Sequence, residues 1–201
     1  MANKTFTVPP TKNGYDFFEA TSSFQKAIRR CDEDQALFWA VEFWESNRAE
    51  YVWQRMFVMT SEDIGLANLN LPQQIWSLYQ MYNYLKGKSN APEKLSYIQA
   101  VLTMVRSEKS RIVDWALIDA FRKHDERVSP EQVPDYALDK HTLRGVAKGR
   151  QGYEFFFAEG AKLINHNKQD REDEYLESSR EILVGRKDFP KNIFGEEVDS
   201  E

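Results

Sequence analysis

The sequence has little of what metal centres and disulfide-stabilised folds need. Cys31 is the only cysteine among 201 residues, which excludes a disulfide within the chain and a cysteine-based zinc cluster. The three histidines, at positions 124, 141 and 166, are too far apart for a His-x-x-His or His-Glu-x-x-His motif. The sequence therefore predicts neither a metal site nor a bound cofactor.

Long apolar runs are also missing. No stretch approaches the roughly 18 consecutive apolar residues that a membrane-spanning helix requires. The first ten residues lack the basic region and apolar core of a signal peptide, so we expect a cytoplasmic protein.

Motifs for nucleotide or acyl chemistry are absent as well. Gly145, Gly149 and Gly152 lie close together, but no strand pattern precedes them and no Gly-x-x-x-x-Gly-Lys-Ser/Thr phosphate loop occurs. No Gly-x-Ser-x-Gly nucleophile motif occurs either. We therefore expect no ATPase core and no enzymatic activity.

The chain is rich in aromatic residues and in apolar residues at helical spacing. Five Trp, nine Tyr and thirteen Phe are enough for a packed core. Leu37, Ala40, Val41 and Trp44 fall at i, i+3, i+4 and i+7, the pattern of an amphipathic helix. No segment alternates as a strand does, so the sequence predicts an all-α protein. The other segments with helical periodicity are 15–30, 48–64, 72–87, 92–105, 110–121 and 171–186.

Composition divides the chain into four parts. We expect a flexible arm over residues 1–14 and a helical domain over 15–128. We expect a helical extension with a basic segment over 129–168, and an acidic tail that contains one amphipathic helix over 169–201. Eleven acidic and five basic residues give the tail a net charge of −6, so the rest of the chain carries +1 of the total of −5. A nearly neutral net charge on residues 1–168 neither excludes nor indicates binding to nucleic acid.

An acidic pair, Glu62-Asp63, precedes Gly65 at the predicted end of the third helix. Carboxylates at a helix C-terminus are disfavoured by the helix dipole. Either the helix breaks near Thr60-Ser61, or a cation is held against the pair, with Arg29 and Arg55 as candidates. Gly65 suits the left-handed position after a helix end. We interpret this group as structural, and a catalytic carboxylate pair as the rival.

A basic segment follows further along. Lys140, Arg144, Lys148 and Arg150 give four positive charges within eleven residues that contain no acid. These side chains are candidates for phosphate contacts, with Tyr153 stacking on an unpaired base. The alternative is that they pair with the acidic tail or with another subunit. For the neighbouring His141 and Thr142, the favoured interpretation is that they brace a helix start.

Several short matches in order carry a family resemblance. The longest match is segment 61–67, which reads Ser-Glu-Asp-Ile-Gly-Leu-Ala. The resemblance also includes residues 26–32, 36–39, Arg55, 99–101 and 109–110. Together they resemble the C-terminal domain of the MgsA/RarA-type replication-associated recombination AAA+ ATPases. The resemblance implies a helical bundle like the collar domain of clamp-loader-related ATPases. It also implies a homo-oligomer, dimer or tetramer.

These expectations combine into one interpretation. The chain is predicted to be a non-catalytic oligomerising helical module in DNA replication, repair or recombination, with weak DNA binding. One alternative is a regulatory partner that co-assembles with a full-length ATPase relative. The other is an enzyme of unknown type that uses Glu62, Asp63 and His141.

Overall fold

The structure, a computed structural model, describes residues 8–126 and 133–185. The chain forms two compact units, Met1–Arg127 and Val128–Glu201, and each is described by itself. All regular structure in the described ranges is helical, which confirms the all-α prediction. No helix among the described residues is both long and apolar enough to cross a membrane.

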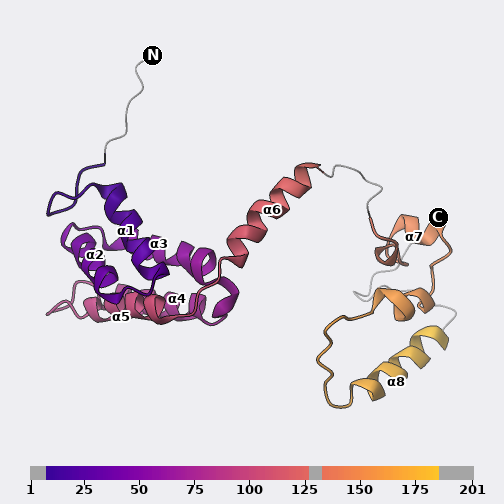
Figure 1. Ribbon diagram of the computed structural model, residues 1–201. Helices are drawn as coiled ribbons and strands as arrows, with labels where there is room; N and C mark the ends of the chain where they lie inside the picture. The colour runs from indigo at the N-terminus through magenta and orange to yellow at the C-terminus, as the bar shows by residue number, and fades with distance from the viewer. Residues whose placement is uncertain (1–7, 127–132, 186–201) are drawn as a thin grey trace. The chain divides into compact units, whose positions relative to one another are not determined.

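The first unit is a bundle of helices joined by short connections (Figure 1). The helix α4 packs against α5, and α1 packs against α2. A π-helical turn, η1, and a 3-10 turn, η2, separate α3 from α4. The elements are α1 (Phe17–Arg29), α2 (Glu33–Glu45), α3 (Ala49–Met59), η1 (Thr60–Ile64), η2 (Gly65–Ala67), α4 (Leu71–Leu85), α5 (Glu93–Arg106) and α6 (Ile112–Glu126).

Local sequence signals fix most of these helix starts. Asp32 caps α2 by accepting a hydrogen bond from the Gln35 backbone N–H at 3.1 Å, as its sequence context predicts. Asp16 caps α1 by accepting from the backbone N–H groups of residues 18 and 19. Pro72 lies in the first turn of α4, where its missing N–H costs nothing.

Large aromatic side chains fill the core of this unit. Trp53, Phe43 and Tyr97 are almost completely buried. The Tyr97 hydroxyl donates to the Ala40 carbonyl at 2.9 Å, so its buried polar atom is satisfied. The predicted stripe of α2 is partly wrong, because Val41 is half exposed. The buried apolar residues of α2 are Ala40, from that stripe, and Ala36 and Phe43, which widen it.

The helix α6 leaves the bundle and contacts it through η1 and η2 (Figure 1). None of its residues is buried, although the sequence shows apolar residues at helical spacing over 110–121. Ile112, Trp115, Leu117, Ile118 and Phe121 are each at least 50% exposed. The prediction of a helix is confirmed, but the described part of the first unit leaves these five apolar side chains largely exposed.

Among the described residues of the second unit, Leu138 is the buried apolar residue. The described elements of this unit are η4 (Asp135–Ala137), α7 (Leu143–Ala147), the π-helical turn η5 (Phe156–Gly160) and α8 (Glu172–Gly185). The expected helical extension is therefore made of single turns and loops within 133–168. The amphipathic helix predicted over 171–186 is α8.

Gly65 joins η1 to η2 in a backbone conformation that requires glycine. Its φ of 50° and ψ of −129° lie outside the left-handed helical region that the sequence predicts, although φ is positive. A Cβ atom here would lie 3.1 Å from the Ser110 carbonyl oxygen and 3.1 Å from Val113 Cγ2. The glycine thus allows the chain entering α6 to approach η1 closely.

We expect Gly65→Ala to lower the free energy of unfolding by about 1–3 kcal/mol, because it combines an unfavourable φ with steric contact. The matched control is Gly87→Ala, whose φ is 79° and whose Cβ would meet nothing within 4 Å. Urea denaturation followed by circular dichroism measures both variants. If both variants lose the same free energy of unfolding, the positive φ alone accounts for the effect, and the close approach to residues 110 and 113 costs nothing.

Candidate functional site

The acidic pair predicted from the sequence lies on the π-helical turn η1. The Gly65 backbone N–H donates to the Thr60 carbonyl, five residues earlier, which is the hydrogen bond of a π-helix. Thr60 Oγ1 also donates to the Phe57 carbonyl at 2.7 Å. Single π-helical turns of this kind occur often at functional sites. The wider turn lets the adjacent residues Glu62 and Asp63 reach the same cation.

That cation is Arg29, on the last turn of α1. Its Nε donates to Asp63 Oδ1 at 2.5 Å, and its Nη2 donates to Glu62 Oε1 at 2.7 Å. The Asp63 side chain is fully buried, while Arg29 and Glu62 keep 28% and 24% of their side-chain surface exposed. The two charge-assisted hydrogen bonds fix the end of α1 against η1.

Arg55, the other candidate, acts mainly through Gln25. Arg55 Nη2 donates to Gln25 Oε1 at 2.9 Å and lies 4.0 Å from Glu62 Oε2. Gln25 Nε2 in turn donates to Glu62 Oε2 at 3.1 Å and to Asp63 Oδ2 at 3.2 Å. Gln25 therefore links the two carboxylates to a second cation.

Sequence reasoning missed a third arginine, Arg111. Its Nη2 lies 3.5 Å from Glu62 Oε1 and its Nε lies 3.7 Å from Asp63 Oδ1. It also pairs with Asp114 and lies over the Trp115 ring, with its Cζ 4.6 Å from the ring centroid. Arg111 directly follows residues 109–110, which are part of the family resemblance, and this is the one sequence signal that pointed to it.

The network joins four parts of the first unit, α1, α3, η1 and the start of α6, and its charges balance. Arg29, Arg55 and Arg111 face three carboxylates, Glu62, Asp63 and Asp114. The Ser110 backbone N–H also donates to the Asp63 carbonyl at 3.0 Å, which fixes the start of α6. Because cations and Gln25 already occupy the carboxylate oxygens, the arrangement favours structural use over proton transfer to a substrate.

The basic segment lies in the second unit and pairs with an acid that precedes it. Lys148 Nζ and Arg150 Nη2 both bind the Asp135 carboxylate, the latter at 2.6 Å. First Arg150 and then Lys148 lower the pKa of Asp135 to about 2. Arg150 also donates to the Leu138 carbonyl at 2.8 Å. These cations hold the turn at 135–138 against residues 148–150.

The other predicted residues of this segment have mixed surroundings. Lys140 Nζ lies 3.2 Å from the centroid of the Tyr153 ring, so a cation already occupies the ring proposed for base stacking. Arg144 is exposed on α7. Thr142 caps α7 by accepting from the Gly145 N–H at 3.0 Å, and the His141 N–H donates to Asp139 Oδ1 at 3.0 Å. Both contacts brace the start of α7.

Residues 30–182 match the sequence profile of the family described as MgsA AAA+ ATPase C terminal. The match runs through both units and into α8.

The chain belongs to the MgsA AAA+ ATPase C-terminal family.

Two curated proteins are similar to this family member. ATPase WRNIP1 of Dictyostelium discoideum is 33% identical over 106 residues, which cover 51% of this chain and 12% of that protein. Replication-associated recombination protein A of Bacillus subtilis (strain 168) is 28% identical over 141 residues, covering 69% of this chain and 32% of that protein. The chain thus matches less than a third of the length of either relative.

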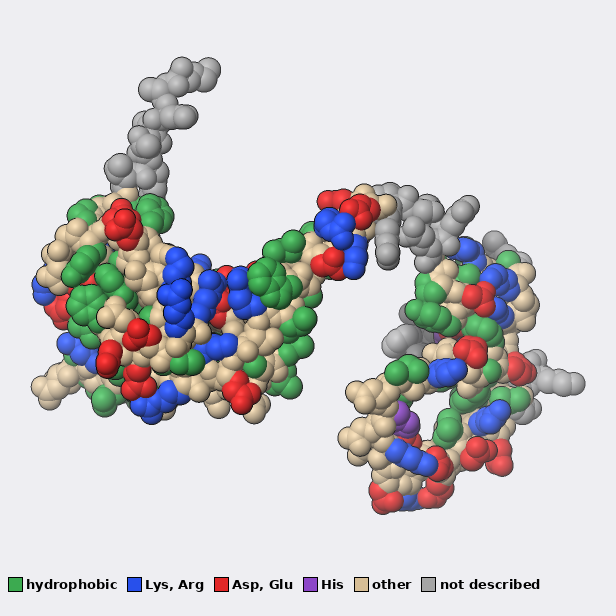
Figure 2. Space-filling model, in the orientation of Figure 1, with side chains coloured by type: hydrophobic (Ala, Val, Ile, Leu, Met, Phe, Trp, Pro, Cys, Tyr) green, Lys and Arg blue, Asp and Glu red, His purple; other side chains and the backbone are tan. Residues whose placement is uncertain are grey.

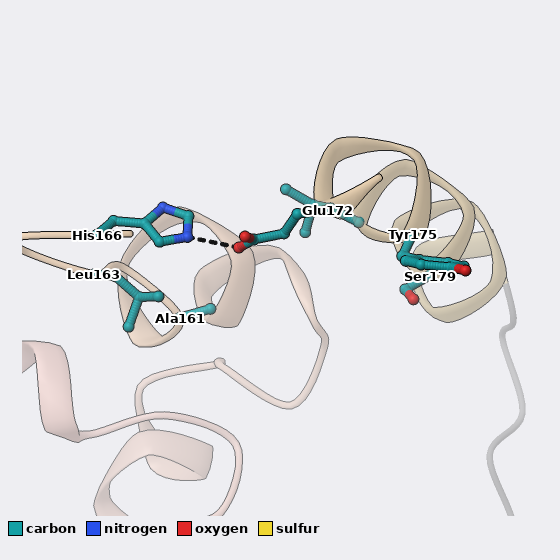
Figure 3. A pocket seen from close by; sticks show the side chains of 7 residues that line it. Ala161, Leu163, His166, Glu172, Tyr175 and Ser179 are labelled. Atoms are coloured by element: carbon teal, nitrogen blue, oxygen red, sulfur yellow. Dashed lines mark ion pairs between the residues drawn. The ribbon is translucent and has the colours of Figure 1, made fainter. Parts of the chain in front are cut away.

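The second unit of this MgsA C-terminal chain also has a pocket of about 420 Å³ beside α8. Figure 3 shows His166 pointing toward Glu172, and the two form an ion pair of 2.6 Å. Ser179 lies further along α8, beyond Tyr175, and no hydrogen bond joins it to His166 among the described contacts (Figure 3). The lining residues therefore do not form a Ser-His-acid triad.

No group of three metal-ligating side chains exists among the described residues. Within the residues that the structure describes, the largest ion-pair network is that of residues 29, 55, 62, 63, 111 and 114.

We expect Asp63→Asn to lower the free energy of unfolding by about 3 kcal/mol, at the low end for a broken buried pair, because Arg29 keeps some access to water. The variant preserves size and leaves the arginines short of one negative charge. Asp34→Asn, on an exposed residue of α2 with no described ion pair, is the control and should change stability by less than about 0.5 kcal/mol. Chemical denaturation measures both. Similar values for the two variants would contradict the structural role of Asp63.

Proposed function

We propose that the chain is a non-catalytic oligomerising helical module that acts in DNA replication, repair or recombination. The similarity to a replication-associated recombination protein supports the proposed role in DNA replication, repair or recombination. The match to only the C-terminal part of these AAA+ proteins, together with the absence of a phosphate loop from the sequence, supports the non-catalytic part.

The observation that carries the oligomerising role is α6. A 15-residue helix without a buried residue exposes two large aromatic side chains, Trp115 at 56% and Phe121 at 69%. Hydrophobic side chains run along this helix in the space-filling view (Figure 2). Single domains rarely leave such surface in water, because burying apolar area stabilises by about 25 cal/mol per Å².

The charges of α6 favour a second copy of this chain as the occupant. Arg122 pairs with Glu126 at 2.7 Å, and Lys123 pairs with Asp119 at 2.5 Å, so residues 119–126 keep a net charge of only −1, from Asp125. Two identical α6 helices can therefore approach with little repulsion between uncompensated charges. Aromatic residues are also enriched in the cores of subunit interfaces.

The DNA-binding part rests on the basic segment. Oligomerisation would repeat Lys140, Arg144, Lys148 and Arg150 once per subunit, which converts a weak site into a multivalent one. Asp135 competes with phosphate for Lys148 and Arg150. Three described acids of the tail, Glu172, Asp173 and Glu174, pair with bases close to them in sequence.

The oligomeric state tests the first part of this proposal. Light scattering of the full chain at micromolar concentration should give the mass of a dimer or tetramer. The double variant Ile118→Glu plus Phe121→Glu should give a monomer, because it places charge in the apolar contact. Leu95→Glu, at a 76% exposed position of α5, should leave the mass unchanged. A monomeric mass for the unaltered chain would refute the oligomerising role.

Binding to single-stranded DNA tests the second part. Asp135→Asn should strengthen binding several-fold at low salt, because it removes the carboxylate that neutralises Lys148 and Arg150. Fluorescence anisotropy with a labelled oligonucleotide measures the effect, which should fall steeply with added salt as counterions compete.

Replacing Arg144, Lys148 and Arg150 together by Gln should abolish this binding without changing the oligomer mass. Asp173→Asn serves as the control for a general change in charge. If the Asp135→Asn protein binds no DNA at low salt, the chain is an assembly device without a nucleic-acid site.

A further inference from the structure

A second polar pocket lies at the end of the bundle opposite to the start of α6. It has a volume of about 220 Å³ and is enclosed by the end of α2, the start of α3, the end of α4 and the start of α5. The 14 residues of α5, at a rise of about 1.5 Å each, place roughly 21 Å between this pocket and the other end of the bundle. The pocket wall includes Trp44, Asn47, Glu50, Tyr82, Lys86 and Glu93.

Glu93 is the unusual member of this wall. Only 8% of its surface is exposed, and its Oε2 atom is buried without a hydrogen-bond partner. It also has no ion pair within residues 8–126 and 133–185. A buried carboxylate without a partner is costly, and its place on the first turn of α5 compensates only part of that cost.

Neighbouring cations are engaged elsewhere. Lys86 pairs with Glu50, whose carboxylate also accepts hydrogen bonds of 3.3 Å from the hydroxyls of Tyr79 and Tyr82. Lys94 Nζ lies 5.4 Å from the centroid of the Trp44 ring. Lys94 therefore approaches a ring of the pocket wall, but it forms no ion pair with Glu93 among the described residues.

Two aromatic rings form part of the same wall. The rings of Trp44 and Tyr82 are nearly perpendicular, at 88°, with their centroids 6.2 Å apart. Ring faces attract cations, and a planar guanidinium both stacks on such a face and binds a carboxylate through two hydrogen bonds. The volume is below the roughly 300–1,000 Å³ of pockets for drug-sized ligands, and it suits one side chain.

We propose that this pocket binds an arginine side chain presented by a protein partner. The guanidinium pairs with Glu93 and takes the place of the Lys94 ammonium against the Trp44 ring, while Glu50 stays paired with Lys86. The contact uses a different part of the first unit from α6, so it is independent of oligomerisation through that helix.

The test is an NMR titration of the full ¹⁵N-labelled chain with Nα-acetyl-arginine amide, which resembles an arginine within a peptide. We expect saturable shifts of the Trp44 indole N–H signal, identified by its loss in Trp44→Phe. Nα-acetyl-citrulline amide has a similar shape without the charge and should cause at least tenfold weaker binding. Free arginine distinguishes a site for the amino acid from a site for an arginine within a peptide, because only an amino-acid site would bind free arginine more tightly than the arginine amide.

Glu93→Gln should weaken binding of the arginine amide at least tenfold, and Glu108→Gln, at an exposed position past the end of α5, should not. Without ligand, Glu93→Gln should raise the melting temperature or leave it unchanged, because an unpaired buried charge is removed. A lower melting temperature would make Glu93 a structural residue and overturn the proposal. Equal shifts with the arginine and citrulline compounds would overturn it too, and this comparison needs no variant.

Discussion

The pairing of Arg29 with Glu62 and Asp63 is the interaction on which the first unit depends. Asp63 is fully buried, and its charge is compensated chiefly by Arg29, which donates to it at 2.5 Å, with Gln25 and Arg111 beside it. The same aspartate accepts from the Ser110 N–H through its backbone carbonyl. One residue of the π-helical turn thus connects the end of α1 to the chain that enters α6.

This constraint explains the form of the surrounding backbone. A regular α-helix would direct consecutive side chains about 100° apart, whereas the π-helical turn lets Glu62 and Asp63 share a cation. Gly65 then reverses the chain with a positive φ and admits Ser110 and Val113 at close range. The start of α6 is held firmly, while the rest of that helix stays uncovered by its own unit.

The two ends of the bundle consequently have different surfaces. One end presents the uncovered apolar helix α6, which suits a second copy of the chain. The other presents a small pocket with an unpaired carboxylate, Glu93, beside the Trp44 ring, which suits a cationic side chain. Within the second unit, Asp135 partly neutralises the basic segment, so phosphate has to compete for Lys148 and Arg150.

Sequence alone determined the helical class, most helix bounds and caps, and the family, because periodicity, capping residues and short motifs are local properties. It also named Arg29 and Arg55 as cations for Glu62 and Asp63, and both lie against the pair. Tertiary structure decided the rest: Arg111 joins from just before α6, Asp135 holds the basic segment, and Glu93 has no ion-pair partner among the described residues. Contacts between residues far apart in sequence depend on how the helices pack, and the spacing of residues along the chain does not encode that packing.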